Sequence, residues 1–174
     1  LGIVDFDVVD YTNLQRQIAH TTQRVGQPKA SSVQAAIAGL NPEVVVTPVA
    51  LRADAALLEA LLAHHDVVLD CSDNFATRHA INAASVSQCK PLVSGAAIRF
   101  DGQITVYDPR DDASPCYACL FPPEAAFEET QCATMGVFAP LVGIIGTMQA
   151  AEALKLISGA APTLSGRLLM LDGR

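Results

Sequence analysis

The amino-acid sequence predicts an α/β protein with a Rossmann-like, mostly parallel sheet, flanking helices and part of the sheet antiparallel. The first observation is that short runs rich in Val, Ile and Leu alternate with segments of helical period along the chain. The second is residues 67–70, a short apolar run that leads directly into polar residues 72–74 and then into a helix. The third is residues 102–107, where apolar and polar residues alternate as in a half-exposed, antiparallel strand.

The composition predicts one globular domain over residues 1–174. Hydrophobic residues make up 51% of the chain and charged residues 17%, and a domain of this length buries roughly 70% of its unfolded surface. The net charge of −7 argues against sequence-independent nucleic-acid binding, because such binding needs a surface of Lys and Arg. Five cysteines are an odd number in a chain whose core needs no disulfides. They indicate a reducing, cytoplasmic compartment and a role in metal binding or chemistry.

The first predicted strand, residues 2–9, carries Asp5 and Asp7 near its carboxyl end. An acid at that place can bind the ribose hydroxyls of a nucleotide, although a solvated strand edge would show the same residues. Residues 12–18 have helical spacing, and either Thr12 or Asn13 is a suitable N-cap. Arg16 stands inside this polar segment. The segment therefore predicts a short polar helix that carries a cation.

Lys29 lies in the first turn of the next predicted helix, which begins near Pro28 and ends before Asn41-Pro42. A cation at that place opposes the helix dipole and gains nothing locally, so its presence indicates an anion nearby. A solvated surface lysine is the alternative. Residues 44–49 then predict a strand, and Pro48 favours an edge position for it. Residues 55–63 predict a further helix that leads into the strand at residues 67–70.

Asp73 follows that strand directly, and the next helix begins near Phe75. Ligands of parallel α/β sheets bind outside the carboxyl ends of the strands, so a carboxylate there faces the ligand. The alternative is that Asp73 only caps the helix over residues 75–87. The strand at residues 90–97 ends in small residues, which allow another group to approach the backbone closely.

Cys116 and Cys119 form a Cys-x-x-Cys turn in a predicted loop. Two such thiolates bind one zinc ion, and a structural zinc takes four ligands, so this chain holds half a site. If the metal is zinc, we expect the second pair beyond Arg174. A thioredoxin-type redox motif is the alternative, but that motif is expected beside the start of a βαβ unit.

Cys132 precedes an apolar helix predicted over residues 137–157. The helix N-terminus would lower the pKa of its thiol and make it a nucleophile, whereas a plain buried cysteine is the alternative. The helix contains Gly143 and Gly146, which would allow close packing, and polar residues interrupt an apolar run shorter than the ~20 residues of a membrane span. We therefore expect this helix in the core or in a homodimer interface. Residues 165–172 predict a last strand.

Six short motifs occur in one order along the whole chain. They are Asp5-Phe-Asp, Thr12-Asn-Leu-Gln-Arg-Gln, Gly26-Gln-Pro-Lys, Leu69-Asp-Cys-Ser-Asp-Asn-Phe, Val93-Ser-Gly-Ala-Ala-Ile-Arg-Phe-Asp-Gly-Gln and Pro115-Cys-Tyr-Ala-Cys. Together they resemble the MoeB/ThiF/HesA group, bacterial relatives of the ubiquitin-activating enzymes. The resemblance implies an ATP-dependent adenylyltransferase of molybdopterin or thiamine biosynthesis. Such an enzyme activates the C-terminal Gly-Gly of a small ubiquitin-like sulfur carrier as an acyl-adenylate and releases pyrophosphate.

The resemblance also implies roles for individual residues. Those that would bind ATP are Asp5 at the ribose, Thr12, Asn13, Leu14 and Gln15 around the nucleotide, and Arg16 and Lys29 at the phosphates. Asp73 with Asn74 would hold Mg²⁺. Cys116 and Cys119 match half of the zinc site of the family, and Cys132 matches the cysteine that links covalently to the carrier in thiamine-type members.

Partners implied by the resemblance are the sulfur carrier, a second copy of the chain, and a sulfurtransferase or cysteine desulfurase, with neither nucleic acid nor membrane. The chain begins Leu-Gly-Ile-Val without Met or a signal-peptide pattern, and it shows neither the Gly-rich phosphate loop nor a second Cys-x-x-Cys. We therefore expect a fragment that is inactive alone. The alternatives are a non-catalytic nucleotide-binding scaffold of the same fold and, from the acidic strand end only, a nicotinamide-dependent dehydrogenase.

Overall fold

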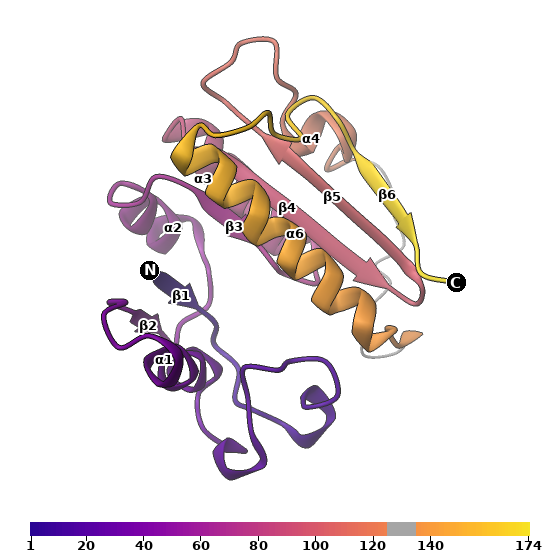
Figure 1. Ribbon diagram of the computed structural model, residues 1–174. Coiled ribbons are helices and arrows are strands. Elements are labelled where there is room, and N and C mark those ends of the chain that lie inside the picture. The colour runs from indigo at the N-terminus through magenta and orange to yellow at the C-terminus, as the bar shows by residue number, and fades with distance from the viewer. Residues whose placement is uncertain (125–134) are drawn as a thin grey trace. The chain divides into compact units, whose positions relative to one another are not determined.

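The computed structural model describes residues 1–124 and 135–174, which form two compact units, residues 1–53 and 54–174. Figure 1 shows the helices and strands of each unit. Cys132, the predicted nucleophile, lies outside the described residues.

In the first unit, a two-stranded parallel sheet packs against one helix. Strand β1 (Gly2–Val4) pairs with β2 (Thr47–Val49), and helix α1 (Lys29–Leu40) contacts both strands. Strand β1 is shorter than predicted because a turn closes directly after it, where the Asp7 amide donates to Oδ1 of Asp5 over 2.9 Å. Both acids thus follow the carboxyl end of a strand, as the sequence predicts.

The segment predicted as a helix over residues 12–18 is instead a single 3-10 turn, η1 (Tyr11–Asn13), followed by further turns. Its N-cap is Asp10 and neither Thr12 nor Asn13: Asp10 Oδ1 accepts from the Thr12 amide over 2.8 Å. Asn13 Oδ1 accepts in return from the Asp10 amide over 3.3 Å. These reciprocal bonds complete one turn, and no packed apolar stripe extends it, since Ile18 is 96% exposed. A second 3-10 turn, η2, covers Thr22–Arg24.

The second unit contains a four-stranded mixed sheet in the order β3-β4-β5-β6. Its strands are β3 (Val68–Asp70), β4 (Leu92–Ile98), β5 (Asp101–Tyr107) and β6 (Leu169–Asp172). Strands β3 and β4 are parallel, and the β4-β5 and β5-β6 pairs are antiparallel. Its helices are α2 (Ala55–Leu62), α3 (Phe75–Ser87), α4 (Tyr117–Leu120) and α6 (Ala139–Ser158). This mixed α/β architecture confirms the predicted fold class.

Strand β5 is buried rather than half-exposed, which corrects the expectation from its alternating sequence. Ile104 and Val106 pack in one cluster with Ala153 of α6. The Tyr107 ring lies edge-on to Tyr117 of α4, with 6.1 Å between the ring centroids. Elements therefore cover both faces of β5, while β4 and β6 flank its edges (Figure 1). A polar residue such as Thr105 is buried for this reason.

The close packing of α6 depends on glycines of the sheet and not on its own glycines. A Cβ added at Gly102 of β5 would lie 2.9 Å from Cδ1 of Ile145, and one at Gly95 of β4 would lie 2.4 Å from Cδ of Gln149. By contrast, a Cβ at Gly143 or Gly146 would meet no described atom within 4 Å. Gly143 and Gly146 both lie on the exposed side of α6, so they do not provide the close packing predicted for the core, and close packing in a dimer interface stays a prediction.

Helix α6 has 20 residues and is long and apolar enough, by length and composition, to cross a membrane. The sequence argument that its apolar run is too short was therefore wrong. In the structure the helix packs along β4 and β5 (Figure 1), and its buried face includes Gln149 and Glu152. Glu152 Oε2 accepts from the Leu164 amide over 2.8 Å. Buried polar groups that bind other elements of the same unit are typical of a helix in a protein interior.

Replacing Leu141 with alanine is expected to lower the free energy of unfolding by about 2–5 kcal/mol, because this fully buried α6 side chain packs beside Gly102. Leu154 on the same helix is 66% exposed, and its replacement with alanine should change the free energy by less than about 0.5 kcal/mol. Urea denaturation followed by circular dichroism measures both. Equal losses would contradict this assignment of the core.

Candidate nucleotide and metal-binding residues

Lys29 is a buried lysine at the start of α1, and only 8% of its surface is exposed. Its Nζ lies 2.9 Å from Oδ2 of Asp7, and its backbone amide donates to the Asp7 carbonyl over 2.9 Å. The anion that the sequence indicates beside Lys29 is therefore, within the first unit, the Asp7 carboxylate. Asp5 accepts from the Asp7 amide. Asp7 therefore contacts both Asp5, the acid predicted for the ribose, and Lys29, the lysine predicted for the phosphates.

The turn at residues 11–16 lies close to the same lysine. Hydrogen bonds from Thr12 and the charge of Lys29 together lower the pKa of Asp10. Asn13 is buried, whereas Arg16 is half-buried and its Nη1 donates to the Thr12 carbonyl over 3.0 Å. The other residues predicted for the nucleotide site are half-buried or exposed; they are Thr12, Leu14 and Gln15. The first unit thus brings Asp5, the η1 turn and Lys29 into one neighbourhood with both charge signs.

His20 belongs to this neighbourhood, although no sequence motif marks it. Its Nδ1 lies 2.8 Å from Oγ of Ser32, which is fully buried on α1. Burial lowers the pKa of His20 below its ordinary 6.5, and the charges of Lys29 and Arg24 lower it further. A lone histidine without neighbouring ligands in the sequence carries no signal that would have indicated this position. The imidazole is therefore held neutral beside two cations.

The low pKa of His20 predicts a pH dependence of stability. The folded protein binds fewer protons at His20 than the unfolded chain, so its stability should fall as the pH drops below 6.5 and be unaffected by this group above that value. Replacing His20 with asparagine should remove this part of the decline. The free energy of unfolding is measured in urea between about pH 8 and about pH 5. Replacing the exposed His64 with asparagine is the control, and an equal change in both variants would refute the assignment.

In the second unit, Asp73 is exposed in the loop that follows β3, and it does not cap α3. The cap is Asn74, whose Oδ1 accepts from the Thr77 amide over 2.9 Å. Its Nδ2 lies 3.5 Å from Oδ1 of Asp73. The capping function that the sequence allowed for Asp73 is therefore fulfilled by its neighbour. The Asp73 carboxylate is left at the carboxyl end of a parallel strand, where it can bind a ligand.

The loop that carries Asp73 is held by two charged residues of the second unit. Asp70 is 1% exposed, and its Oδ1 accepts from the Ser72 amide over 2.9 Å and from Ser72 Oγ over 2.7 Å. Burial raises the pKa of Asp70, and the Ser72 hydrogen bonds and the Arg78 charge oppose this shift. Arg78 Nη2 donates to the Ser72 carbonyl over 2.8 Å. Asp70 is the last residue of β3, and no role was predicted for it.

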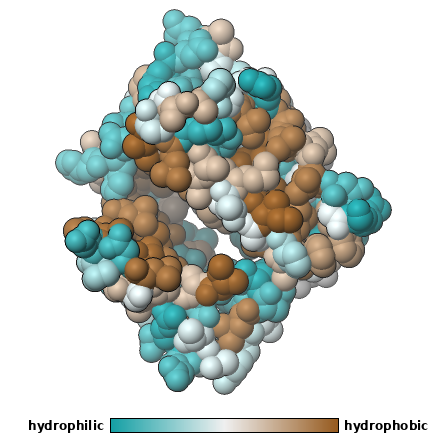
Figure 2. Space-filling view, viewed as in Figure 1, coloured by the Kyte–Doolittle hydropathy of each residue, from teal (hydrophilic) through white to brown (hydrophobic). Residues whose placement is uncertain are grey.

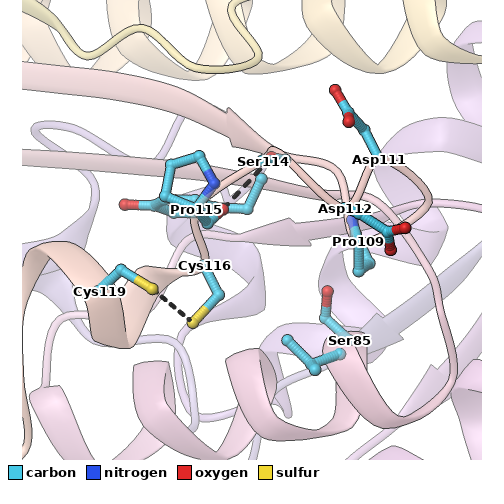
Figure 3. A pocket seen from close by; sticks show the side chains of 10 residues that line it. Ser85, Pro109, Asp111, Asp112, Ser114, Pro115, Cys116 and Cys119 are labelled. Atoms are coloured by element: carbon cyan, nitrogen blue, oxygen red, sulfur yellow. Dashed lines mark hydrogen bonds between the residues drawn. The ribbon is translucent and has the colours of Figure 1, made fainter.

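Cys116 is the N-cap of α4 and Cys119 lies within this helix, with 3.6 Å between their sulfurs. Figure 3 shows the two sulfurs facing each other. Both are free thiols. Two thiolates about 2.3 Å from one tetrahedral zinc would lie roughly 3.8 Å apart, so this pair fits two zinc ligands. Burial alone would raise the pKa of Cys116, but hydrogen bonds from Cys119 and Asn82 lower it. A cavity of about 280 Å³ adjoins both cysteines. Within residues 1–124 and 135–174, no three His, Cys, Asp or Glu side chains are grouped to hold a metal.

The mixed α/β fold and the acids that follow β1 and β3 define a protein of the Rossmann-like class. The chain belongs to the ThiF family, which it matches over residues 1–174. It is 47% identical over 174 residues to the molybdopterin-synthase adenylyltransferase of Escherichia coli (strain K12), covering 99% of this chain and 68% of that protein. It is 48% identical over 177 residues to the adenylyltransferase and sulfurtransferase MOCS3 of Drosophila grimshawi, covering 38% of that protein. The predicted family is thereby confirmed.

Solved structures show the same fold at lower identity. E. coli MccB in complex with ATP superimposes with a TM-score of 0.78 at 20% identity, over 99% of this chain and 56% of that one. The PaaA crystal structure superimposes with the same TM-score and identity over 52% of its chain. This chain thus spans about two thirds of the bacterial adenylyltransferases it matches and little more than half of the solved chains.

Proposed function

We propose that this chain is the adenylation domain of an ATP-dependent adenylyltransferase that activates the C-terminal Gly-Gly of a ubiquitin-like sulfur carrier for molybdopterin biosynthesis. The observation that carries the proposal is 47% identity over 99% of the chain to a protein named molybdopterin-synthase adenylyltransferase. A Salmonella typhimurium protein of the same name is 44% identical over the same share of the chain. Relatives that are named as enzymes favour this function over a non-catalytic scaffold.

The reaction needs positive charge more than it needs an acid and a base. A carboxylate oxygen of the carrier bonds to the α-phosphorus of ATP while the bond from that phosphorus to the bridging oxygen breaks, and pyrophosphate leaves with the electron pair. Negative charge grows on the α-phosphate and on the leaving group, so fixed cations stabilise the transition state. We assign Arg16 and Lys29 to these phosphates, Asp5 to the ribose, and the turn at residues 12–15 to the nucleotide. Support comes from the buried, cationic position of Lys29 beside the acidic end of β1.

Asp73 is proposed to hold Mg²⁺, because its carboxylate is exposed at the carboxyl end of β3 while Asn74 caps the helix. When bound, Mg²⁺ would neutralise phosphate charge and orient the triphosphate. Asn74 contributes as the N-cap of α3, because this cap fixes the backbone directly after Asp73. Asp73 and Asn74 belong to the second unit, and the residues proposed for the phosphates belong to the first.

Zinc binding by Cys116 and Cys119 is proposed for the full-length protein, with two further ligands from outside residues 1–174. The fit of their sulfur separation to two zinc ligands supports it. We expect about one zinc per chain by elemental mass spectrometry, and its loss in Cys116→Ser. Cys89, an exposed free thiol in the same unit, is the matched control. Retention of zinc in Cys116→Ser, or its loss in Cys89→Ser, would contradict this assignment.

The proposed partners are the carrier, a second copy of the chain, and a sulfurtransferase or cysteine desulfurase in the cytoplasm. The homodimer is supported by apolar side chains on the outer face of α6, where Ile144, Leu154 and Ile157 are exposed. Figure 2 shows apolar patches on this face of the protein. Covalent attachment of the carrier to Cys132 also stays a proposal, since that residue lies outside the described chain.

The decisive experiment is ATP–pyrophosphate exchange by the full-length protein with a Gly-Gly-ended sulfur carrier. We expect exchange that requires the carrier and disappears when its last glycine is removed. Exchange that is independent of the carrier would refute the proposed substrate. The absence of exchange with the molybdopterin-type and the thiamine-type carriers alike would refute the proposed function and favour a scaffold.

A further inference from the structure

We propose that Gln149, from the middle of α6, is a positioning residue for Asp73: it anchors the end of β3 and thereby sets the loop on which the Asp73 carboxylate stands. The magnesium part of this inference rests on the proposed function of Asp73. The anchoring part rests only on contacts within the second unit.

The side-chain amide of Gln149 forms hydrogen bonds both with the end of β3 and with the neighbouring strand β4. Gln149 is 3% exposed, and its Nε2 donates to the Asp70 carbonyl over 2.8 Å and to the Val93 carbonyl over 3.3 Å. Its Oε1 accepts from the Cys71 thiol over 3.7 Å. The amide therefore ties the last residue of β3 and the first residue of the loop to the neighbouring strand β4.

Strand β4 leaves room for this amide at Gly95. A Cβ on Gly95 would lie 2.4 Å from Cδ, 2.6 Å from Oε1 and 2.8 Å from Nε2 of Gln149. Contacts under 3 Å are forbidden, so any side chain at this position must displace the amide. Gly95 and Gln149 are thus complementary, although they lie on different elements. Substitution at either one should disturb the same anchor.

The anchor at Asp70 is linked to Asp73 through a short segment held by hydrogen bonds. The carbonyl of Asp70 is held by Gln149, while its carboxylate binds the amide and the hydroxyl of Ser72. Arg78 of α3 holds the Ser72 carbonyl, and Asn74 fixes the other end of the loop as the cap of α3. Asp73 is the residue between these two fixed ends. A shift of the Asp70 backbone must therefore move the Asp73 carboxylate or break one of these hydrogen bonds.

Packing alone does not require a glutamine at this position. Its neighbours on the buried face of α6 include Leu141, Ile145 and Ala153, so an apolar side chain would also be compatible with this face. Burying an amide costs free energy, and hydrogen bonds of equal number recover little net stability. What the amide adds over an apolar residue is a defined place for the Asp70 carbonyl. Groups that orient ligating carboxylates typically change metal affinity or activity 10- to 100-fold when they are replaced.

The test compares three variants of the full-length protein with the wild type. Gln149→Met removes the amide and keeps the length of the side chain, whereas Gly95→Ala displaces the amide and leaves Gln149 intact. Glu152→Met is the matched control, because Glu152 is also buried on α6 but anchors the Leu164 amide instead of β3. Amide hydrogen exchange of residues 70–77 and 159–166 is measured, together with the Mg²⁺ concentration that gives half-maximal ATP–pyrophosphate exchange.

Gln149→Met and Gly95→Ala are both expected to accelerate hydrogen exchange in residues 70–77 and to raise the half-saturating Mg²⁺ concentration about tenfold. Glu152→Met should accelerate hydrogen exchange only in residues 159–166 and leave the Mg²⁺ requirement unchanged within about twofold. Equal behaviour of all three variants, or an unchanged loop in both Gln149→Met and Gly95→Ala, would overturn the inference. A wild type without activity would refute the proposed function, and hydrogen exchange would still decide whether Gln149 anchors the loop.

Discussion

Replacing Asp73 with alanine is expected to reduce carrier-dependent ATP–pyrophosphate exchange by ~10²-fold or more. The carboxylate is exposed after β3 and is free of the capping bond that Asn74 makes, so its removal should leave the fold intact. If it holds Mg²⁺, its loss should also raise the Mg²⁺ concentration that half-maximal exchange requires. Initial rates at several Mg²⁺ concentrations separate these two effects.

The matched control for this prediction is Asp66→Ala. Asp66 is an exposed acid close to the same strand, but it precedes β3 whereas Asp73 follows it. It therefore has the same charge and lies at the opposite end of the strand from the proposed ligand site. Exchange that survives Asp73→Ala, or that falls equally in Asp66→Ala, would count against the assignment of Asp73.

Replacing Lys29 with methionine should lower ATP–pyrophosphate exchange about 10²- to 10³-fold, because a fixed cation near the phosphates stabilises charge that grows in the transition state. Methionine keeps an unbranched, apolar stem for the buried position and removes the ammonium group. The Michaelis constant for ATP and the maximal rate are measured separately. A higher Michaelis constant and a lower maximal rate are both expected if Lys29 contacts ATP in the ground state and in the transition state.

Asp7→Asn distinguishes this function of Lys29 from its ion pair. The substitution removes the negative partner, whose side chain is 49% exposed, and leaves the ammonium group in place. Exchange should then fall by less than about tenfold, since the carboxylate that loses its charge is half-exposed. If Asp7→Asn abolished exchange as fully as Lys29→Met, the ion pair itself would be the requirement, and the phosphate assignment would be wrong.

Much of the fold could be predicted because its signals are local. Helix α3 begins and ends where the sequence analysis placed it, since Asn74 supplies a cap and an Ala-rich segment follows. Helix α1 begins at Lys29 and ends before Asn41-Pro42, as the Pro28 and Pro42 positions indicate. The acids after β1 and β3 were also found from the strand pattern alone. Their function as ligands stays a prediction.

Other features depended on neighbours that are remote in the sequence. The alternation of apolar and polar residues in β5 indicates one solvent-exposed face, but α6 covers one of its faces and α4 covers the other. The helix predicted over residues 12–18 is a single turn, because no other described element packs on Ile18, which is 96% exposed. Close packing was predicted at Gly143 and Gly146 of α6. The glycines at which α6 approaches the sheet closely are instead Gly95 and Gly102 of the sheet itself.

The amino-acid sequence by itself determined the fold class, the family and the chemical types of the candidate ligands, because periodicity, turn residues and motif order are properties of short segments. Only the tertiary structure decided which side chain is paired with Lys29 and which amide holds the end of β3. Gln149 reaches Asp70 across 79 positions of the chain. Contacts of that separation arise when whole elements pack together, and no local pattern in a single sequence encodes them.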